Sequence, residues 1–246
     1  MPLRLENVHA SYGPIEVLFG IDLECGDGEI VALLGTNGAG KTTILRVVSG
    51  VLKPTSGDVV FEDESLVGHR PPDIVKRGIV QMPGGRGVFP GMTVNENLEI
   101  AGFLYGKHFR KRKEMIDRVF TYFPVLAKRK GQMAGSMSGG QQQMLTLAKS
   151  FVMDPKLLLI DELSLGLAPV IVEDLLEIVR RFNAEGVSVV LVEQHVDLAL
   201  DVASRAYFLE RGEVRFAGPA EDLRGRDDLL RSVFLSSETA ETVTAS

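Results

Sequence analysis

Three short runs of apolar residues stand out because their apolar positions follow one another without alternation. They lie at residues 29–35 (EIVALLG), 156–161 (KLLLID) and 187–193 (VSVVLVE). Continuous apolar runs of this length are typical of parallel strands whose two faces are both covered. The pattern therefore predicts three buried strands within a mostly parallel sheet.

Helical patterns follow two of these runs, one from Lys41 and one from Ala168 to a stop at Gly186. Apolar residues of the second helix recur every three or four positions, as on the buried face of an amphipathic helix. The residues on this stripe are Ile171, Leu175, Ile178, Val179 and Phe182. Strand, loop and helix in succession predict an α/β fold.

Two further segments predict antiparallel hairpins. Residues 58–68 turn at their acidic middle, and residues 206–218 turn at Arg211 and Gly212. Residues 92–153 carry helical patterns without a strong strand run, which predicts a helical subdomain inserted into the core.

The chain is therefore expected to form a single domain in four parts. Residues 1–91 and 154–235 form the core with its hairpins, and residues 92–153 form the helical subdomain. Residues 236–246 are small and polar and are expected to be a loose tail. A chain of 246 residues is long enough to bury a full core.

The composition narrows the class of protein. Hydrophobic residues make up 45% of the chain, which excludes a disordered chain, and the net charge of −6 argues against nucleic acid as a partner. The single cysteine, Cys25, excludes an internal disulfide and is typical of a reducing compartment. Because no apolar stretch approaches the ~18 residues of a membrane span, the chain is not expected to cross a membrane by itself.

A glycine-rich segment, GTNGAGKTT, lies between a predicted strand and a predicted helix and fits the pattern G-x-x-x-x-G-K-[ST]. Glycines allow the backbone to wrap a phosphate, and the helix start adds partial positive charge. Lys41 is expected to reach the β- and γ-phosphates of a nucleotide, and the Thr42 hydroxyl to bind Mg²⁺. The residues predicted to bind the nucleotide here are Gly35, Thr36, Asn37, Gly38, Ala39, Gly40, Lys41, Thr42 and Thr43.

A pair of acidic residues, Asp161 and Glu162, ends the apolar run LLLIDEL at residues 157–163. Ligands of open α/β sheets bind at the carboxyl ends of the strands. We therefore expect Asp161 to hold the Mg²⁺ shell and Glu162 to polarise the water that attacks the phosphate.

A third motif, GSMSGGQQQMLTLAKSF at residues 135–151, begins an amphipathic helix at Ser138. A serine and the free N–H groups of a helix start form an anion site. The order S-G-G-Q, then an apolar run that ends in Asp-Glu, resembles the ATP-binding subunit of ABC transporters, from about residue 3 to residue 235. The resemblance implies a P-loop ATPase fold with an inserted helical subdomain.

The same resemblance implies a head-to-tail dimer in which each ATP lies between the P-loop of one chain and the S-G-G-Q segment of the other. The residues of that segment are Ser138, Gly139, Gly140 and Gln141. Tyr12 matches the aromatic residue of the family that stacks on adenine. Residues 164–167 (SLGL) match the loop that crosses the dimer interface beside Glu162.

Three longer stretches resemble subunits that energise the uptake of branched-chain amino acids, and also relatives that import urea or amides. They are PGGRGVFPGMTVNENL, DELSLGLAP and LVEQHVDLAL. The implied partners are transmembrane permease subunits, a second ATP-binding subunit (the same chain or a paralogue) and, indirectly, an extracytoplasmic solute-binding protein. The implied place of work is the cytoplasmic face of the membrane. A soluble ABC protein without a transporter, or an assembly module that binds ATP with little hydrolysis, remain alternatives.

The sequence departs from the family pattern where a Gln or Glu should contact the metal ion. That position lies six residues before Pro90, which is Gly84. Gln81 is an alternative metal residue, although it lies three residues early along an extended strand. A glycine here is alternatively explained by a backbone angle with positive φ. With Asp161 and the P-loop present, we still expect a working ATPase, with weaker coupling to the membrane subunits.

A second departure concerns the histidine that contacts the γ-phosphate in the family. It should follow Glu193 directly, where this chain has Gln194, and His195 comes one residue late. Both are candidate catalytic residues. Gln194 is favoured because its amide donates hydrogen bonds, whereas a shift of one residue after a strand turns the side chain away.

Overall fold

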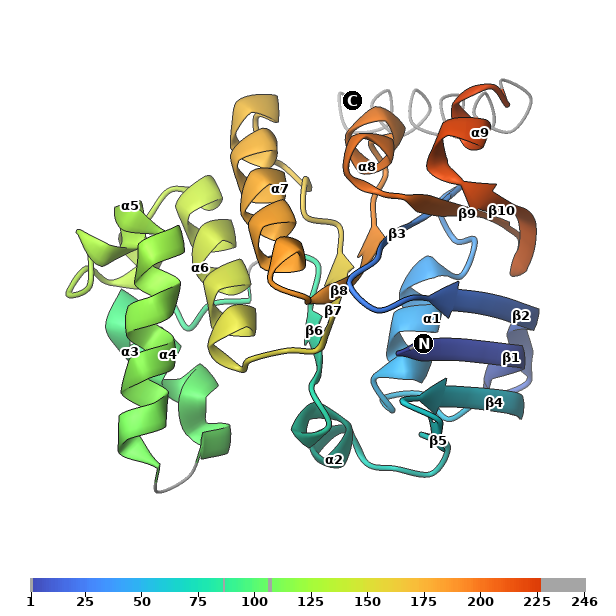
Figure 1. The fold of residues 1–246 in the computed structure, drawn as a ribbon, viewed down its shortest axis with the longest axis horizontal. Coiled ribbons are helices and arrows are strands. Elements are labelled where there is room, and N and C mark those ends of the chain that lie inside the picture. Colours follow the sequence, from blue (N-terminus) through green and yellow to red (C-terminus); the bar gives the residue numbers. More distant parts are fainter. Residues whose placement is uncertain (1, 86, 106–107, 227–246) are drawn as a thin grey trace.

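The computed structural model describes residues 2–85, 87–105 and 108–226. In this part of the chain two β-sheets pack near each other, and a group of helices projects to one side of them (Figure 1). The polar tail predicted at residues 236–246, and the last residues of the predicted core, lie outside the described residues.

The larger sheet has six strands among the described residues. In spatial order they are β10 (Glu213–Pro219), β9 (Arg205–Glu210), β3 (Ile30–Gly35), β8 (Ser188–Val192), β7 (Leu157–Asp161) and β6 (Ile79–Met82). All neighbouring pairs are parallel except β9 and β10, which form the hairpin predicted to turn at Arg211 and Gly212. The three predicted apolar strands are β3, β8 and β7, and every residue of each is buried. The prediction of a mostly parallel sheet is confirmed.

The smaller sheet is antiparallel and contains a hairpin that the apolar pattern did not predict. Its order is β2 (Ile15–Cys25), β1 (Leu3–Tyr12), β4 (Ser56–Phe61) and β5 (Glu64–Ser65). The hairpin of β4 and β5 was predicted. The hairpin of β1 and β2 was missed because a register shift after Leu5 interrupts the alternation of buried and exposed residues along β1, and a shift between Leu18 and Ile21 interrupts it along β2.

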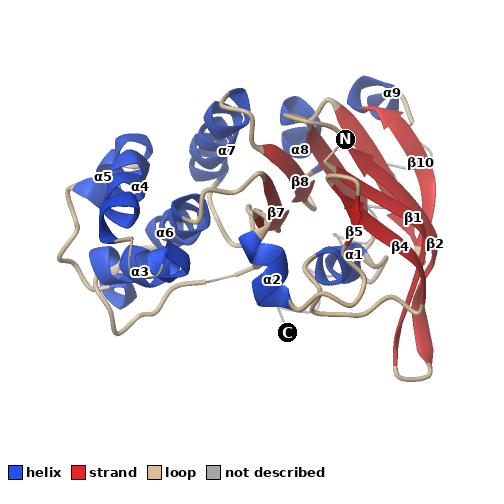
Figure 2. Cartoon of the chain, turned by 60° about the horizontal axis from the view of Figure 1, so that its bottom comes forward, coloured by secondary structure: helices blue, strands red, loops and turns tan. Residues whose placement is uncertain are grey.

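Each face of the larger sheet is covered by different elements. Alternate residues of its central strands face α1 (Lys41–Val48) and the smaller sheet, and the others face helices on the opposite side (Figure 2). The helices on that side include α6 (Gly139–Val152), α7 (Pro169–Ala184), α8 (Val196–Val202) and α9 (Ala220–Arg224), while α2 (Pro71–Lys76) leads into β6. Coverage of both faces explains why these strands are continuous apolar runs.

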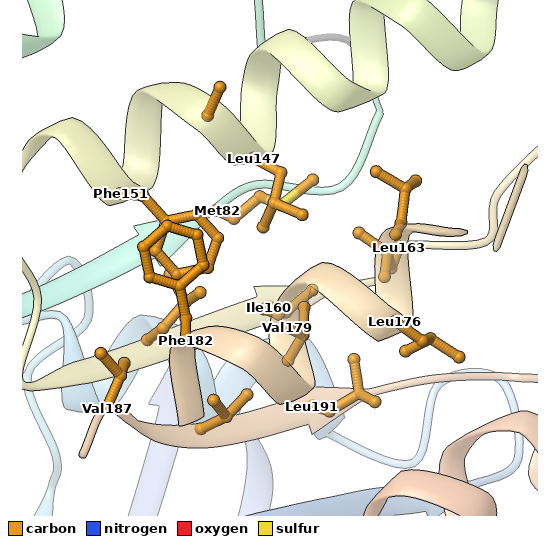
Figure 3. Packing of buried hydrophobic residues seen from close by; sticks show 14 of the residues in the cluster. Met82, Leu147, Phe151, Ile160, Leu163, Leu176, Val179, Phe182, Val187 and Leu191 are labelled. Atoms are coloured by element: carbon orange, nitrogen blue, oxygen red, sulfur yellow. The ribbon is translucent and has the colours of Figure 1, made fainter. Parts of the chain in front are cut away.

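The inserted helical subdomain is confirmed. Its elements are α3 (Val94–Ala101), the 3₁₀ turn η1 (Gly102–Tyr105), α4 (Phe109–Tyr122), α5 (Pro124–Ala127), the 3₁₀ turn η2 (Ala134–Ser136) and α6 (Gly139–Val152). The last turn of α6 joins this group to the core, because the ring of Phe151 stacks on Phe182 of α7 with 3.4 Å between centroids (Figure 3). Both rings belong to the same buried cluster as Met82 and Ile160, which are paired on the neighbouring strands β6 and β7.

Candidate functional site

The glycine-rich segment connects β3 to α1 and borders a cavity of about 260 Å³. Gly35, Gly38 and Gly40 have φ angles of 146°, 77° and 103°, a region that side chains rarely adopt. A β-carbon at Gly35 would also clash with the main-chain oxygen of Leu209. The glycines therefore let the backbone turn tightly around the cavity. The residues that line the cavity are Val17, Asn37, Gly38, Ala39, Gly40, Lys41, Thr42, Thr43 and Glu162.

Lys41 is held at the wall of this cavity, with 6% of its surface exposed. Its Nζ donates hydrogen bonds to the main-chain oxygens of Gly35 (2.9 Å) and Thr36 (3.0 Å). Burial lowers the pKa of the Lys41 ammonium group, and the charges of Glu162 and Asp161 oppose this effect. The carbonyl groups orient the ammonium group without neutralising it, so the charge stays available to an anion.

The acidic pair at the end of β7 lies opposite the start of α1. The Thr42 hydroxyl donates a hydrogen bond of 3.2 Å to Oδ1 of Asp161, across 119 positions of sequence. Burial raises the pKa of the Asp161 carboxyl group, which is 7% exposed, and the Thr42 hydrogen bond opposes this shift. The sheet order β3-β8-β7 thus brings together the hydroxyl and the carboxylate that the sequence assigned to one metal ion.

Glu162 lies where the chain leaves β7, and its φ of 52° is in the left-handed region. That conformation costs a non-glycine residue roughly 1 kcal/mol. Two contacts hold it: the Glu162 N–H donates to the oxygen of Val192 (2.9 Å), and Nε2 of Gln194 donates to Oε1 of Glu162 (2.7 Å). The Glu162 side chain thereby lines both the P-loop cavity and the neighbouring cavity described next.

The two residues after Glu193 are placed differently. Gln194 is half-buried and contacts Glu162, whereas His195 is exposed at the start of α8. Of the two candidates, the geometry brings only Gln194 into hydrogen-bond contact with the acidic pair.

A second cavity, of about 550 Å³, opens on the other side of the acidic pair. Gln81 and Gly84 both line it, together with Thr42 and Asp161. Gly84 does not have a left-handed φ, whereas the next residue, Gly85, has a φ of 79°. The backbone therefore does not require glycine at position 84. Gln81 lies in β6 opposite Leu159, two residues before Asp161.

Tyr12, predicted to stack on adenine, lies at the end of β1 with 40% of its surface exposed. Its hydroxyl accepts a hydrogen bond of 2.9 Å from Nη1 of Arg46 on α1. It is not among the residues that line the P-loop cavity. The contact with α1 nevertheless places its ring on the side of the smaller sheet that faces the P-loop helix.

The segment Ser138–Gln141 is not brought to the P-loop of its own chain. It begins α6 in the helical subdomain and lines neither of the two cavities described above. The Ser138 hydroxyl accepts from the Gln141 N–H (3.4 Å), and the Gln141 side chain accepts from the Ser138 N–H (3.2 Å). This capping box fixes the helix start, where Ser138 and Gly139 are exposed and Gly140 and Gln141 are half-buried.

The structure also contains a polar contact that the sequence patterns did not predict. The carboxylate of Glu193, 1% exposed, accepts hydrogen bonds from both the main-chain N–H and the hydroxyl of Ser164. The only signal in the sequence is a glutamate that directly follows the apolar run of β8, where a buried position is expected. No pattern identified Ser164, 29 positions away, as its partner.

Comparison with known proteins identifies the family in which the P-loop, the acidic pair and the S-G-G-Q segment occur together. A family model described as ABC transporter matches residues 18–164, more than half of the chain. The chain belongs to the ABC transporter family. The resemblance inferred from the P-loop, the acidic pair and the S-G-G-Q segment is therefore confirmed, and the chain is an ATP-binding cassette.

Related cassettes cover nearly the whole chain. A high-affinity branched-chain amino acid transport ATP-binding protein, BraG of Pseudomonas aeruginosa, is 44% identical over 86% of this chain and 90% of its own length. A probable branched-chain amino acid transport ATP-binding protein, LivF of Archaeoglobus fulgidus, is 33% identical over 90% and 93%. A xylose/arabinose import ATP-binding protein, XylG of Sulfolobus acidocaldarius, is 30% identical over 89% of each.

Solved structures share the fold. A nucleotide-free ATP-binding cassette from an ABC transporter has a TM-score of 0.85 at 24% identity and covers 95% of this chain and 98% of its own. A dimeric ATP-binding cassette in a post-hydrolysis state, bound to ADP and Pi, has a TM-score of 0.77 at 25% identity and covers 89% and 98%. Among the described residues of this cassette, no helix is both long and apolar enough to span a bilayer.

Proposed function

We propose that this cassette hydrolyses ATP with Mg²⁺ to energise a membrane importer, and that the cargo of that importer is a branched-chain amino acid. The observation that carries the hydrolytic part is the meeting of Lys41, Thr42, Asp161 and Glu162 at one edge of the larger sheet. The assignment of the cargo rests on the similarity to BraG and to LivF.

The residues around the P-loop cavity fit a nucleotide phosphate. The first turn of α1 has main-chain N–H groups without intrahelical partners, and Lys41 adds a full positive charge. An anion at this place satisfies the N–H groups and pairs with the Lys41 ammonium group. We assign the same role to the other residues of the glycine-rich segment, and adenine stacking to Tyr12.

The Thr42 hydroxyl and the Asp161 carboxylate fit a hard cation, since both are oxygen ligands and already lie within hydrogen-bond distance. A bound Mg²⁺ supplies positive charge that offsets the charge developing on the phosphate oxygens. Gln81 also lines this cavity, but it lies in β6 two residues before the level of Asp161, and Gly84 supplies no side chain, so we assign no third side chain to the cation.

Glu162 is the proposed general base. It borders the P-loop cavity directly after Asp161, where a water next to the γ-phosphate can transfer a proton to its carboxylate. Gln194 donates its amide hydrogen bond to Oε1 of Glu162 and so fixes the carboxylate for that transfer. We assign no such contact to His195, which is exposed.

The site is proposed to be completed by a second cassette, either the same chain or a paralogue. Ser138 and Gly139 are exposed and Gly140 and Gln141 half-buried on the helical subdomain, and the segment does not line the P-loop cavity of its own chain. A helix start that presents N–H groups fits a phosphate of a nucleotide bound to the other cassette. The dimeric post-hydrolysis cassette supports this arrangement.

The proposed place of work is the cytoplasmic face of the membrane, in contact with permease subunits that receive solute from a binding protein. Two experiments test the proposal. Purification from membranes should recover the cassette with transmembrane subunits. Cells that lack the gene should lose uptake of labelled leucine, isoleucine or valine, and the wild type, but not Glu162→Gln, should restore it.

One observation favours a second candidate function. Gly84 leaves the metal side of the site without the polar side chain expected there, which would suit a module that binds ATP, dimerises and barely hydrolyses it. Dimerisation on addition of ATP, together with a negligible phosphate release rate in the assembled complex, would support this second function instead.

A further inference from the structure

Glu193 is a buried carboxylate at the edge of the site that the hydrolytic roles above do not use. It follows β8 directly and has 1% of its surface exposed. Charged side chains are almost never buried to this extent unless they are paired. Its close partners are hydrogen-bond donors of two loops rather than a lysine or arginine.

The donors come from two loops, one after β7 and one after β8. Ser164 donates its main-chain N–H to Oε1 of Glu193 (3.0 Å) and its hydroxyl to Oε2 (2.6 Å). The N–H of Gln194 donates to the same Oε2 at 3.3 Å. One carboxylate thus ties the loop after β7 to the loop after β8.

This connection closes a ring of hydrogen bonds around the proposed base. Gln194 is tied to Glu193 through its main chain and to Glu162 through its side-chain amide (2.7 Å). Ser164 lies two residues after Glu162 on the same loop. Glu193 therefore holds Gln194 through its N–H group and Ser164 through two hydrogen bonds. Because Ser164 and Glu162 share the loop after β7, these contacts fix the Gln194 amide relative to Glu162.

The same loop also contacts the helix that begins with the S-G-G-Q segment. Nε2 of Gln143, a buried residue of α6, donates to the main-chain oxygen of Leu163 (3.4 Å). Ser164 is the next residue. Glu193 therefore fixes a loop that lies between the base of this cassette and the helix whose start faces a second cassette.

Stability alone does not account for a carboxylate at this position. Burial raises the pKa of the Glu193 carboxyl group, which means that the folded protein disfavours its charged form. A neutral residue with the same shape would avoid that cost. What the carboxylate adds is a pair of acceptor oxygens that reach donors on two loops at once.

We propose that Glu193 is a positioning residue for hydrolysis, which holds Gln194 against Glu162 and fixes the 164–167 loop through Ser164. This inference rests on the proposed ATPase function. Glu193 does not touch the P-loop cavity, so it acts on the rate of the hydrolytic step and not on the affinity for nucleotide.

The test measures kcat and KM for ATP hydrolysis, and nucleotide affinity, on the membrane complex purified with the full-length chain as its cassette. Glu193→Ala should lower kcat about tenfold or more, with KM and affinity changed less than about threefold, because the loss lies in the hydrolytic step. Glu193→Gln should lower kcat less than Glu193→Ala, because its amide oxygen still accepts from one Ser164 donor while its NH2 group takes the place of the second acceptor. Ser164→Ala should lower kcat less than Glu193→Ala, and it should add nothing in the Glu193→Ala background.

Ser188→Ala is the matched control. Ser188 is buried at the other end of β8, where its hydroxyl donates to the oxygen of Gly26 (3.0 Å) and accepts from the Gly28 N–H (2.9 Å). Its loss removes two partly buried hydrogen bonds from the same strand without touching the acidic pair. We expect a lower melting temperature for this variant with an unchanged kcat.

The outcomes separate this inference from the proposed function. If the wild type hydrolyses no ATP above Glu162→Gln, the proposed function fails. If the wild type is active but Glu193→Ala keeps full kcat, or lowers affinity as much as kcat, the inference alone is overturned. If Glu193→Ala does not fold, the variants Ser164→Ala and Glu193→Gln decide. A full kcat in Ser164→Ala, or a tenfold loss of kcat in Glu193→Gln, overturns the inference.

Discussion

Gly84 faces Asp161. A β-carbon at residue 84 would lie 3.3 Å from the main-chain oxygen of Asp161, which is tighter than most such contacts, and 3.9 Å from its Cγ, which is an ordinary contact. The backbone at Gly84 is not left-handed, and the cavity that both residues line holds about 550 Å³. The space beside the proposed metal position can therefore accept a longer side chain once the main chain at Asp161 shifts by a few tenths of an ångström.

The first prediction follows from this space. Gly84→Glu should fold with a melting temperature slightly below that of the wild type, because the backbone conformation suits any residue but the β-carbon crowds the main-chain oxygen of Asp161. Its carboxylate adds a ligand beside Asp161, so hydrolysis in the assembled transporter should be unchanged or faster. A phosphate-release assay and a melting curve measure both, and a fall in both quantities would show that residue 84 must be glycine.

Gln81→Ala separates the two candidates for the metal contact. With Gln81 in β6, two residues before the level of Asp161, we expect the Mg²⁺ dependence of hydrolysis to change less than about threefold. A tenfold lower rate of ATP hydrolysis, equivalent to a barrier raised by about 1.4 kcal/mol, would instead assign the metal contact to Gln81.

Replacing Glu162 by Gln should abolish hydrolysis while ATP still binds. The amide keeps the size of the side chain and its place beside Gln194, but it cannot accept the proton of the attacking water. Gel filtration with ATP and Mg²⁺ should show a stable dimer that the wild type forms only transiently. Full turnover by this variant would exclude Glu162 as the base.

Lys41→Ala should weaken ATP binding itself. The Nζ atom is held between Gly35 and Thr36 at the wall of the P-loop cavity, and its loss removes the positive partner of a desolvated phosphate. Calorimetry should show an affinity at least tenfold lower for ATP. An unchanged affinity would contradict the assignment of this loop to phosphate binding.

Gln194→Ala and His195→Ala should have opposite effects. Gln194→Ala removes the 2.7 Å hydrogen bond to Glu162 and should lower kcat about tenfold or more. His195 is exposed at the start of α8, and its replacement should leave kcat within about twofold. Parallel steady-state assays decide between them, and a larger loss in His195→Ala would reverse the assignment.

The stability of the cassette should also report on Glu193. Burial raises the pKa of this carboxyl group in the folded state above its ordinary value of 4.5, so the unfolded state binds fewer protons in that range. The contribution of Glu193 to stability should therefore fall as the pH rises from about 4.5 through the raised pKa, and then stay constant. Denaturant unfolding of the wild type and of Glu193→Gln should be measured across this pH range. The free energy of unfolding of the wild type should fall relative to that of Glu193→Gln as the pH rises.

The sequence by itself determined the parts of this protein that lie within short contiguous stretches. The glycines and Lys41 of the P-loop, the acidic pair after an apolar strand, and the Ser138 helix start were all predicted from local patterns. Each depends on the backbone conformation of a few successive residues, which composition and spacing control directly. The mostly parallel sheet followed from the same reasoning, since strands covered on both faces must be apolar throughout.

Only the tertiary structure decided which distant residues meet. Thr42 reaches Asp161, and Ser164 reaches Glu193, because the sheet places β8 between β3 and β7, an order that the sequence does not display. The hairpin of β1 and β2 was missed because its register shifts hide the alternating pattern. The different placement of Gln194 and His195 was likewise settled by the turn after β8, where a shift of one residue changes the direction of a side chain.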